Sequence, residues 1–450
     1  MTGPLSLPPD DMRRLGYRVV DRIVEHLERL GELPPVRSGD AEPLRARLGG
    51  PPPEQPGDPD AELDVLFDEV LPFIQHADHP RFFARIGSPS NYIGALADAA
   101  AAGFNVFTGS WTGGSGPATV ELVVLDWLRD WCGLPEGAEG VLTTGGSVAN
   151  LAGLAAMRTA RGPGVVYFSD QTHAAVPRAL RVLGLEEARV LPSDAGFRLD
   201  LGELRAAIAA DRAAGRRPAC VVATAGTTST GSVDPLDALA DVCAEEDLWL
   251  HVDGAYGAPA VLWPEARPLL AGLERADSLV LDPHKWLFQP YEIGCLLVRE
   301  PELLERTFAL EGAYLRDVLS GEVNFRNRSV QLTRGARALK LWLSIRVFGL
   351  AAFRAAVGRG IALSEHAEAL LRERPGWEVV TGAQLAIVCF RREGDDARQT
   401  RIVEAMARDG YALPSTTELG GRVVLRLCTI NPRTTEEDVE RTIERMDEVE

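Results

Sequence analysis

Short apolar runs alternate with helical segments between residues 92 and 345, and this alternation limits the possible folds more than any other feature of the chain. The runs read "GVVYFSD", "ARVLPSD", "ACVVATAG", "LWLHVDG", "SLVLDP" and "GCLLV". Strands that are joined through helices usually lie parallel, and the helices cover both faces of the resulting sheet. We therefore expect an α/β domain with a mainly parallel sheet over residues 92–345.

The two flanks of this region have different patterns. Residues 10–30 carry apolar side chains at spacings of three and four, which is typical of an amphipathic helix. The apolar positions are Met12, Leu15, Val19, Ile23, Leu27 and Leu30. Such a stripe has to pack on the rest of the chain or on a second subunit. We expect an N-terminal helical segment over 1–91, the large domain over 92–345 and a small α+β domain over 346–450.

Composition argues against several classes of protein. The 450 residues carry 47 basic and 65 acidic side chains, and the net charge of −18 is spread along the chain, which argues against a nucleic-acid-binding surface. No apolar run reaches the ~20 residues that span a bilayer, and the start "MTGPLSLPPDDMRR" lacks the pattern of a signal peptide. The six cysteines form no CxxC pair, and most lie in apolar runs. We expect a cytoplasmic protein that binds neither membrane nor nucleic acid.

Lys285 follows one of the apolar runs, in "SLVLDPHKWLFQP" over residues 278–290. A lysine at a strand end often extends its ammonium group into water. The alternative is an amine nucleophile that is held in a pocket, where it can form a Schiff base with a carbonyl compound. The residues that follow the other strands decide between these interpretations.

Two further stretches supply groups that a phosphorylated pyridine cofactor requires. In "GVLTTGGSVANLAGLAAMR" a strand-like run meets Gly145, Gly146 and Ser147, and a helix begins at once, so backbone N–H groups and the helix dipole can bind an anion. In "LWLHVDGAYGAP" Asp253 ends a strand and can hold a proton on a pyridine nitrogen, and Ala255 is small enough to lie beside a flat ring. Taken singly, these are also an ordinary glycine turn and an ordinary strand-end carboxylate.

His173 and Thr228 also follow strands. The imidazole of His173 can stack on a pyridine face, and His251 shares a strand face with Asp253 and can support its carboxylate, although either histidine can instead be a packed structural residue. In open α/β sheets the carboxyl ends of strands line the ligand crevice. Asp253 precedes Lys285 by 32 residues, about one helix and one strand. The sequence therefore predicts a pyridoxal phosphate site with Lys285 as the Schiff-base lysine.

The same stretches resemble a known family. The matching runs are "HPRFFARIGSPSNYIGALAD", "TGSWTGGSGPATVELVVLDWL", "SDQTH", "VATAGTTSTGSVDPL", "WLHVDGAYG", "DPHKWL" and "RGARALKLW". They are similar to the fold-type I, group II pyridoxal-phosphate decarboxylases, and to the aromatic-L-amino-acid branch in particular. The resemblance covers essentially the whole chain. It implies a mainly parallel seven-stranded sheet, and a homodimer with its active sites at the subunit interface and the N-terminal helix packed on the partner.

The resemblance also implies roles for single residues. Those expected to bind the cofactor are Gly145, Gly146, Ser147, His173, Thr228, Asp253, Ala255, His284 and Lys285. Among them, His173, Asp253 and Lys285 are expected to act in catalysis. Tyr314, in "LEGAYLRDVLSGEVNF", matches a loop tyrosine that is implicated in protonating the substrate carbon after CO2 leaves. Arg326 matches a family arginine near the active site.

The implied reaction is decarboxylation of an L-amino acid, aromatic or related, to its amine and CO2. In related aldehyde synthases a phenylalanine replaces the loop tyrosine, so Tyr314 favours simple over oxidative decarboxylation. A decarboxylating oxidase or aldehyde synthase is the alternative on the same scaffold. A cofactor-binding protein without activity is a third hypothesis, from a different functional class.

The expected substrate pocket departs from the aromatic enzymes at Arg85 and Ile86, which stand where those enzymes have an aromatic, proline-containing stretch. Arg85 either faces the pocket, where it would bind an acidic substrate by charge-assisted hydrogen bonds, or faces solvent. Phe104 and Trp111 are expected to form an apolar wall. Asp282 stands where some relatives have asparagine, which leaves its contact with the phosphate open.

Overall fold

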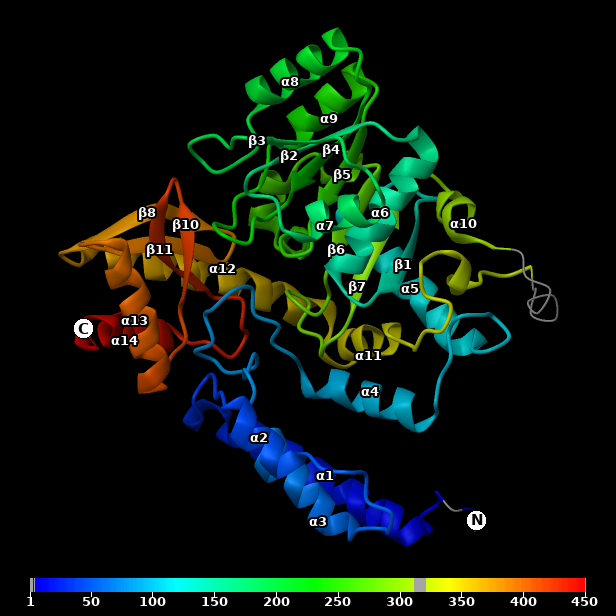
Figure 1. Ribbon diagram of the computed structural model, residues 1–450, viewed down its shortest axis with the longest axis vertical. Helices are drawn as coiled ribbons and strands as arrows, with labels where there is room; N and C mark the ends of the chain where they lie inside the picture. The colour runs from blue at the N-terminus through cyan, green and yellow to red at the C-terminus, as the bar shows by residue number, and fades with distance from the viewer. Residues whose placement is uncertain (1–2, 4, 311–320, 450) are drawn as a thin grey trace.

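The computed structural model describes residue 3 and residues 5–310 and 321–449, and its centre is a seven-stranded sheet (Figure 1). The strands are β1 (Glu139–Thr143), β2 (Val165–Ser169), β3 (Ala188–Leu191), β4 (Pro218–Thr224), β5 (Trp249–Asp253), β6 (Ser278–Leu281) and β7 (Gly294–Val298). They lie in the order β1-β7-β6-β5-β4-β2-β3. β7 runs antiparallel to β1 and β6, and the other pairings are parallel. The predicted mainly parallel sheet is confirmed.

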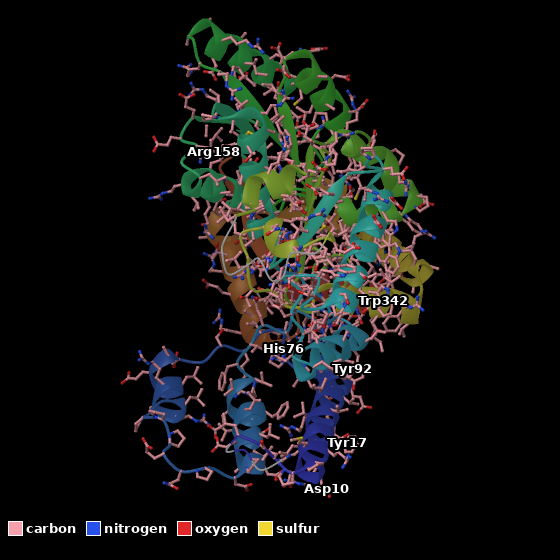
Figure 2. The ribbon with its side chains drawn as sticks, turned by 90° about the vertical axis from the view of Figure 1, so that its right-hand side faces the viewer. Asp10, Tyr17, His76, Tyr92, Arg158 and Trp342 are labelled. Carbon is pink, nitrogen blue, oxygen red and sulfur yellow. The ribbon has the colours of Figure 1, made fainter. Side chains whose placement is uncertain are left out.

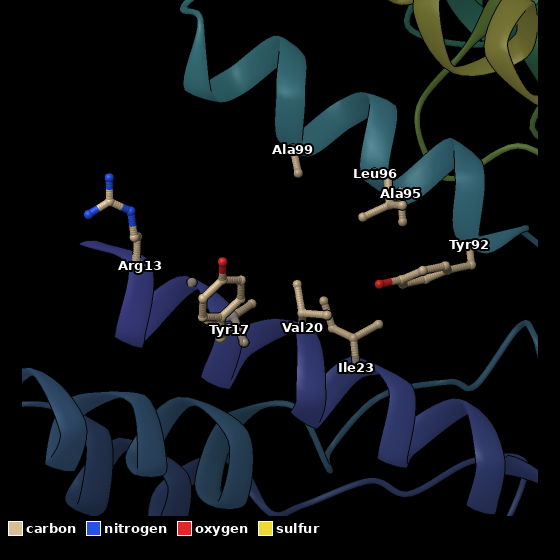
Figure 3. Close-up of a pocket in the computed structure, with 10 residues that line it drawn as sticks. Arg13, Tyr17, Val20, Ile23, Tyr92, Ala95, Leu96 and Ala99 are labelled. Carbon is tan, nitrogen blue, oxygen red and sulfur yellow. The ribbon is translucent and has the colours of Figure 1, made fainter. Parts of the chain in front are cut away.

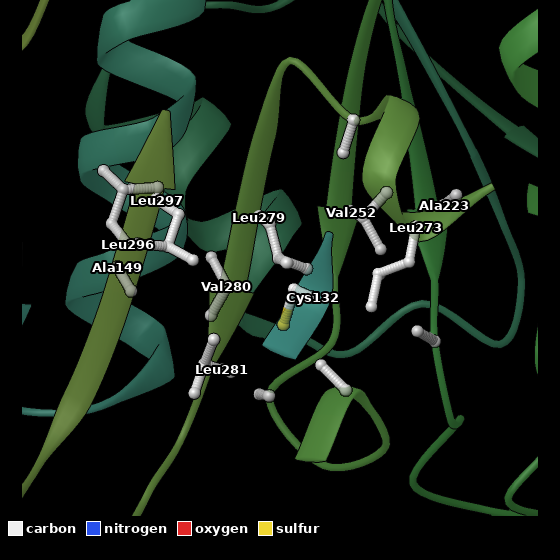
Figure 4. Packing of buried hydrophobic residues seen from close by; sticks show 14 of the residues in the cluster. Cys132, Ala149, Ala223, Val252, Leu273, Leu279, Val280, Leu281, Leu296 and Leu297 are labelled. Carbon is white, nitrogen blue, oxygen red and sulfur yellow. The ribbon is translucent and has the colours of Figure 1, made fainter. Parts of the chain in front are cut away.

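Helices cover this sheet and close its core. They are α5 (Ser115–Cys132), α6 (Gly146–Arg161), α7 (Ala175–Val182), α8 (Leu201–Ala213), α9 (Leu236–Glu245), α10 (Leu303–Phe308) and α11 (Ala338–Phe348). α6 packs across β5, β6 and β7. Figure 4 shows apolar side chains of these strands, Val252, Leu279 and Leu296, in one buried cluster with Cys132 of α5. A core packed on both faces keeps the strand ends rigid, and rigid ends position the side chains that follow them.

The C-terminal part forms a second, antiparallel sheet in the order β10-β11-β9-β8. Its elements are α12 (Leu350–Glu373), β8 (Trp377–Gln384), β9 (Ile387–Arg392), α13 (Asp396–Asp409), β10 (Ser415–Leu419), β11 (Arg422–Cys428) and α14 (Glu436–Glu448). Thr435 caps α14 through reciprocal hydrogen bonds with Asp438. Within the described part of the chain, no single helix is long and apolar enough to cross a bilayer, and α11 with α12 reaches that length only as a pair bent by 95°.

The N-terminal segment projects from the body of the protein (Figure 1, Figure 2). It contains α1 (Pro9–Arg29), α2 (Ala41–Leu48) and α3 (Pro59–Asp64), and α4 (Tyr92–Gly103) lies between it and the body. Arg14 and Arg18 of α1 pair with Asp60 of α3, which ties these two helices together. The predicted amphipathic helix is α1, but it buries no residue within this chain. Instead, side chains such as Tyr17 face α4 across an open groove of about 490 Å³ (Figure 3).

Short helical turns complete the chain. The 3-10 turns are η1 (Leu30–Glu32), η3 (Ala258–Leu262), η4 (Pro264–Leu270), η5 (Leu273–Arg275) and η7 (Phe325–Asn327), and η2 (Val65–Val70) is a π-helix. A buried ion pair, Arg334 with Glu121, joins the segment after η7 to α5 at 2.7 Å. Glu121 also accepts the backbone N–H of Leu142 in β1 at 3.0 Å. This buried contact fixes β1 relative to α5, next to the turn that opens α6.

Three of the seven histidines lie where the N-terminal segment joins the body. The ring centroids of His26, in α1, and His76 are 5.2 Å apart, and His79 follows in the segment that leads to α4. Burial lowers the pKa of all three imidazoles, that of His79 to about 4. The negative charge of Asp78 opposes this shift at His26 and His76, but burial has the larger effect.

Acidification should therefore weaken the folded state. Because the folded-state pKa of His79 lies below the usual 6.5, the unfolded chain binds this proton first, so the contribution of His79 to stability is complete above pH 6.5 and is lost as pH falls toward 4. His79→Gln should reduce the loss of unfolding free energy between pH 7.5 and pH 5 by about 2 kcal/mol. The partly exposed His366, in the small domain, supplies the control His366→Gln. Urea unfolding at both pH values measures the losses, and equal losses in wild type and His79→Gln would contradict this assignment.

Candidate active site

One cavity is lined by residues that follow the strands of the large sheet. It has a volume of about 440 Å³ and lies at the carboxyl ends of β4, β5 and β6, beside the N-terminus of α6. Its lining consists of Thr144, Gly145, Gly146, Ser147, Val148, Asn150, His173, Thr224, Gly226, Thr228, Asp253, Ala255, Tyr256, Asp282, His284, Lys285, Tyr291 and Glu292. This edge of an open α/β sheet is the usual position of a ligand.

Gly145 and Gly146 bring the backbone close to this cavity. Gly145 has a φ of +132°, a conformation that residues with a side chain rarely adopt. A Cβ atom on Gly146 would lie 2.8 Å from Oδ2 of Asp282, so a side chain there would force its neighbours apart. α6 begins at Gly146, and the first N–H groups of a helix lack intrahelical acceptors and attract anions. This end of the cavity therefore suits a phosphate group.

Lys285 enters the cavity from the turn after β6. Its Nζ lies 3.2 Å from Oδ2 of Asp282, whose side chain is 3% exposed. Oδ1 of Asp282 has no hydrogen-bond partner among the described residues, so this carboxylate depends mainly on Lys285 for charge compensation. The neighbouring His284 donates from Nδ1 to the carbonyl oxygen of Ile293 at 2.7 Å, and burial lowers the pKa of its imidazole. The lysine thus ends in a cavity beside a buried carboxylate, not in bulk water.

Asp253 ends β5 and lines the same cavity. Its Oδ1 accepts a hydrogen bond from the backbone N–H of Ala255 at 3.1 Å, and its Oδ2 accepts one from Nδ2 of Asn150 at 3.2 Å. An ionised carboxylate has more acceptor positions than these two donors use, so Asp253 can hold one more proton donor in the cavity. His251 was expected to support this carboxylate, and it does so through Asn150 and not by direct contact.

His173 and Tyr256 also line the cavity. Nδ1 of His173 accepts the backbone N–H of Ala175 at 3.2 Å, which places the proton of the neutral imidazole on Nε2. Tyr256 stacks on Trp286 with 5.1 Å between ring centroids and an angle of 9° between the planes. Its hydroxyl oxygen accepts the backbone N–H of Ala386 at 3.0 Å, which ties the site to the small domain.

The nine residues predicted to bind the cofactor all line this one cavity. They are Gly145, Gly146, Ser147, His173, Thr228, Asp253, Ala255, His284 and Lys285. The five residues predicted to contact the substrate, Arg85, Ile86, Phe104, Trp111 and Arg326, do not line it within this chain. The nine cofactor candidates thus lie together at one cavity, whereas the five substrate candidates lie elsewhere in this chain.

Arg85 is held by its backbone, and its side chain is exposed. It has a φ of +55°, its N–H donates to Oγ of Ser415 at 3.2 Å, and its carbonyl oxygen accepts from Nη1 of Arg426 at 2.7 Å. Within this chain the Arg85 side chain is therefore exposed and does not line the cavity. The next residue, Ile86, packs against the large core.

The predicted apolar wall is not formed within this chain. Phe104, at the end of α4, is 87% exposed, while Trp111 packs against the large core. Arg326, in η7, is 6% exposed, and its backbone N–H donates to the carbonyl oxygen of Gly109 at 3.0 Å. None of these three residues lines the cavity that contains Lys285; α4 packs against α11, and η7 packs against α10.

The cavity also contains residues that sequence reasoning did not select. Asn150 follows Gly146 by four residues, one turn of α6, and a search for polar residues at that helical spacing would have found it. Tyr291 and Glu292 lie in the connection between β6 and β7 and also line the cavity. No spacing or motif in the sequence marks those two positions.

Tyr314 lies in residues 311–320, outside the described residues. The described stems on either side of that segment meet at Glu139, the first residue of β1. Its Oε1 accepts the backbone N–H of Leu304 in α10 at 2.8 Å, and its Oε2 pairs with Nη2 of Arg328 at 3.1 Å, just after η7. One buried carboxylate thus holds both stems.

These side chains fit pyridoxal phosphate. The backbone at Gly146 leaves no room for a Cβ atom and presents a helix N-terminus, as a phosphate site requires. Asp253 keeps acceptor capacity for a protonated ring nitrogen, and Ala255 adds little bulk beside it. Lys285 supplies the amine that an aldehyde needs.

Comparison with known proteins gives the same cofactor. Residues 50–393 match the family described as "Pyridoxal-dependent decarboxylase conserved domain". A Bacillus atrophaeus protein named aromatic-L-amino-acid decarboxylase is 45% identical, over 98% of this chain and 95% of that protein. An Arabidopsis thaliana protein named phenylacetaldehyde synthase is 31% identical, over 97% and 95%. The crystal structure of Oryza sativa TDC with PLP and tryptamine matches with a TM-score of 0.94 at 29% identity and covers 100% of this chain and 99% of that one.

Proposed function

The chain belongs to the pyridoxal-dependent decarboxylase family, and we propose that its substrates are aromatic L-amino acids. It is a carboxy-lyase that removes CO2 from an amino acid with pyridoxal phosphate as cofactor. The name of the Bacillus relative and the tryptamine in the rice structure support an aromatic side chain. Within this chain, the charge of the cavity is the observation that favours an aromatic over an acidic substrate.

Acidic side chains outnumber lysines and arginines in the described lining of the cavity. Asp253, Asp282 and Glu292 line it, whereas Lys285 is the one lysine and no arginine is among the described lining residues. An acidic substrate would bring a second carboxylate toward like charges with no guanidinium to bind it, which is unfavourable. A neutral aromatic side chain avoids this cost.

Pyridoxal phosphate, when bound, supplies an aldehyde for amines and a ring that takes up the electron pair left as CO2 departs. In this chain Gly145, Gly146 and Ser147 would hold its phosphate, and Asp253 would face its ring nitrogen. Lys285 would hold its aldehyde until the substrate amine arrives.

The chain's own residues hold protons at three positions. Asp253 favours the protonated form of the nitrogen it faces, because an ionised carboxylate stabilises a nearby cation. Asp282 lies with its Oδ2 3.2 Å from Nζ of Lys285 and can accept a hydrogen bond from an N–H of that amine whenever the amine is free. Nε2 of His173 carries the proton of the neutral ring and is available to donate to a substrate carboxylate.

Steady-state kinetics with single amino acids test the substrate proposal. We expect kcat/KM for tyrosine, phenylalanine or tryptophan to exceed that for glutamate by at least about a hundredfold, because an unpaired buried carboxylate costs several kcal/mol. Arg85→Gln should leave the aromatic values unchanged, since its side chain is exposed. Faster turnover of glutamate that is lost in Arg85→Gln would instead establish an acidic substrate bound by Arg85.

We propose simple decarboxylation, without oxidation of the substrate carbon. The support is Tyr314, a tyrosine at the position where related aldehyde synthases carry phenylalanine. The Arabidopsis relative named phenylacetaldehyde synthase makes oxidative decarboxylation the second candidate. The role of Tyr314 as proton donor stays a prediction from the sequence.

We propose a homodimer in which α1 packs on the partner subunit. The apolar groove between α1 and α4, together with the exposed Phe104 at the end of α4, supports this proposal. Light scattering should give twice the mass of one chain, and Val20→Asp, in the groove, should shift the protein toward the monomer. A wild-type protein that is monomeric at micromolar concentration would contradict the proposal.

We propose that the protein is cytoplasmic. Its cysteines, Cys132, Cys220, Cys243, Cys295, Cys389 and Cys428, are all buried free thiols. Burial raises the pKa of each thiol above its usual value. Six thiols without a disulfide are typical of a reducing compartment.

A further inference from the structure

Five buried polar residues form one hydrogen-bonded chain behind the cavity. Nε1 of Trp249 lies 2.8 Å from Oγ of Ser278, and that oxygen lies 2.7 Å from Nδ1 of His251. Nε2 of His251 lies 2.9 Å from Oδ1 of Asn150, and Nδ2 of Asn150 lies 3.2 Å from Oδ2 of Asp253. Each of the five residues is at most 5% exposed. A polar network this deeply buried is costly unless every member is paired.

The two ends of this chain determine the direction of every hydrogen bond in it. The indole N–H of Trp249 can only donate, and an ionised Asp253 can only accept. The amide N–H groups of Asn150 donate to Asp253 and to the carbonyl oxygen of Gly146, at 3.2 and 2.8 Å, so the amide oxygen is left to accept from the Nε2–H of His251. With the proton of the neutral imidazole on Nε2, Nδ1 can only accept, and the hydroxyl of Ser278 donates to it. The oxygen of that hydroxyl accepts from Trp249.

The surroundings keep the imidazole of His251 neutral and in place. Burial lowers the pKa of His251 to about 4, although the charge of Asp253 acts in the opposite direction. Gly153, on α6, leaves the space that the ring occupies. A Cβ atom on Gly153 would lie 2.7 Å from Cε1 of the imidazole, closer than unbonded carbon atoms approach. The strand and the helix therefore both fix the ring.

We infer that Trp249, Ser278, His251 and Asn150 act as positioning residues, which orient Asp253 toward the cavity through one chain of hydrogen bonds with a single direction. The chain of hydrogen bonds ends at Asp253, whose carboxylate faces the ring nitrogen of the cofactor in the function proposed above. The inference rests on that cofactor site, and it does not depend on which amino acid is decarboxylated. His251 does not line the cavity, so it would act on the site only through Asn150 and Asp253.

Titration of the apoprotein with pyridoxal phosphate, followed by absorbance, tests the inference without relying on turnover. Asn150→Ala should weaken cofactor binding by about tenfold to a hundredfold, because it removes a hydrogen bond to a charged group, and such bonds contribute more than those between neutral groups. Ser278→Ala should weaken it by a smaller factor. Ser364→Ala is the matched control, since Ser364 is also fully buried and hydrogen-bonded, to carbonyl oxygens of Ile361 and Leu385 in the small domain. It should change binding by less than about twofold.

A double variant distinguishes one connected chain of hydrogen bonds from independent contacts. If Ser278 acts on Asp253 through Asn150, the Asn150→Ala/Ser278→Ala protein should bind the cofactor no more weakly than Asn150→Ala alone. If Ser278 and Asn150 act independently, the two factors multiply, and that result would overturn the inference. Equal effects of Ser278→Ala and Ser364→Ala would overturn it as well.

NMR of the wild-type protein labelled with ¹⁵N-histidine decides the matter should a variant fail to fold. The inference requires a neutral His251 at pH 7 with the proton on Nε2, so Nε2 should show a protonated and Nδ1 an unprotonated chemical shift. A proton on Nδ1 alone, or a cationic ring, would reverse or break the chain and refute the inference. Cofactor binding without turnover of any aromatic amino acid would refute the substrate proposal and leave both of these tests valid.

Discussion

Replacing Lys285 with arginine should lower kcat by at least about a thousandfold, because a guanidinium stays protonated and cannot condense with an aldehyde. Arginine keeps the positive charge beside Asp282, so the loss would report the missing amine and not a missing ion pair. The chain offers a matched control, because Lys285 and Lys340 are its two lysines. Lys340 is buried, pairs with Asp98 at 2.7 Å and does not line the cavity. Lys340→Arg should therefore retain most of the activity.

Covalent labelling gives a second readout for the same residue. After borohydride reduction of the cofactor-loaded protein, mass spectrometry should find the cofactor on the peptide that contains Lys285. Labelling of Lys340, or a Lys285→Arg protein with nearly wild-type kcat, would show that the amine has been assigned to the wrong residue.

Asp253→Asn should lower kcat by about 10²- to 10³-fold and change KM much less, because it removes charge stabilisation that matters most as the electron pair enters the ring. The substitution keeps the size of the side chain, so β5 and the contact with the backbone N–H of Ala255 should survive. Steady-state kinetics on protein saturated with cofactor measure the effect.

Asp170→Asn is the control for this change of charge. Asp170 directly follows β2, near the same edge of the sheet, but it is exposed and does not line the cavity. Its substitution should leave kcat within about twofold of wild type. A kcat for Asp253→Asn as high as that of Asp170→Asn would mean that the Asp253 carboxylate does not serve the ring.

The cofactor end of the site could be predicted because its residues follow strands. Parallel strands bring their carboxyl ends to one edge, so Thr228, Asp253 and Lys285 had to lie near one another once the sheet was predicted. The glycine turn before α6 is recognisable in the sequence, because residues other than glycine rarely adopt a φ such as the +132° of Gly145. Local patterns of this kind can be read directly from a sequence.

The remaining features depend on contacts between distant parts of the chain. Asn150 meets His251 and Asp253 across 101 and 103 residues, and no local pattern pairs them. The direction of Arg85 follows from a left-handed backbone and from contacts with β10 and β11, 330 and 341 residues away. The apolar stripe of α1 was visible in the sequence, but its spacing says nothing about which surface covers it.

The stoichiometry of products from one aromatic amino acid is the most direct test of the proposed reaction. Purified, cofactor-loaded protein would be given tyrosine or phenylalanine, and CO2, amine, ammonia and hydrogen peroxide would be measured in the same sample. We predict equal amounts of CO2 and amine, no peroxide, and no product from Lys285→Arg. CO2 with aldehyde, ammonia and peroxide in place of amine would contradict simple decarboxylation, and the absence of CO2 from every aromatic amino acid would contradict the proposed substrate class.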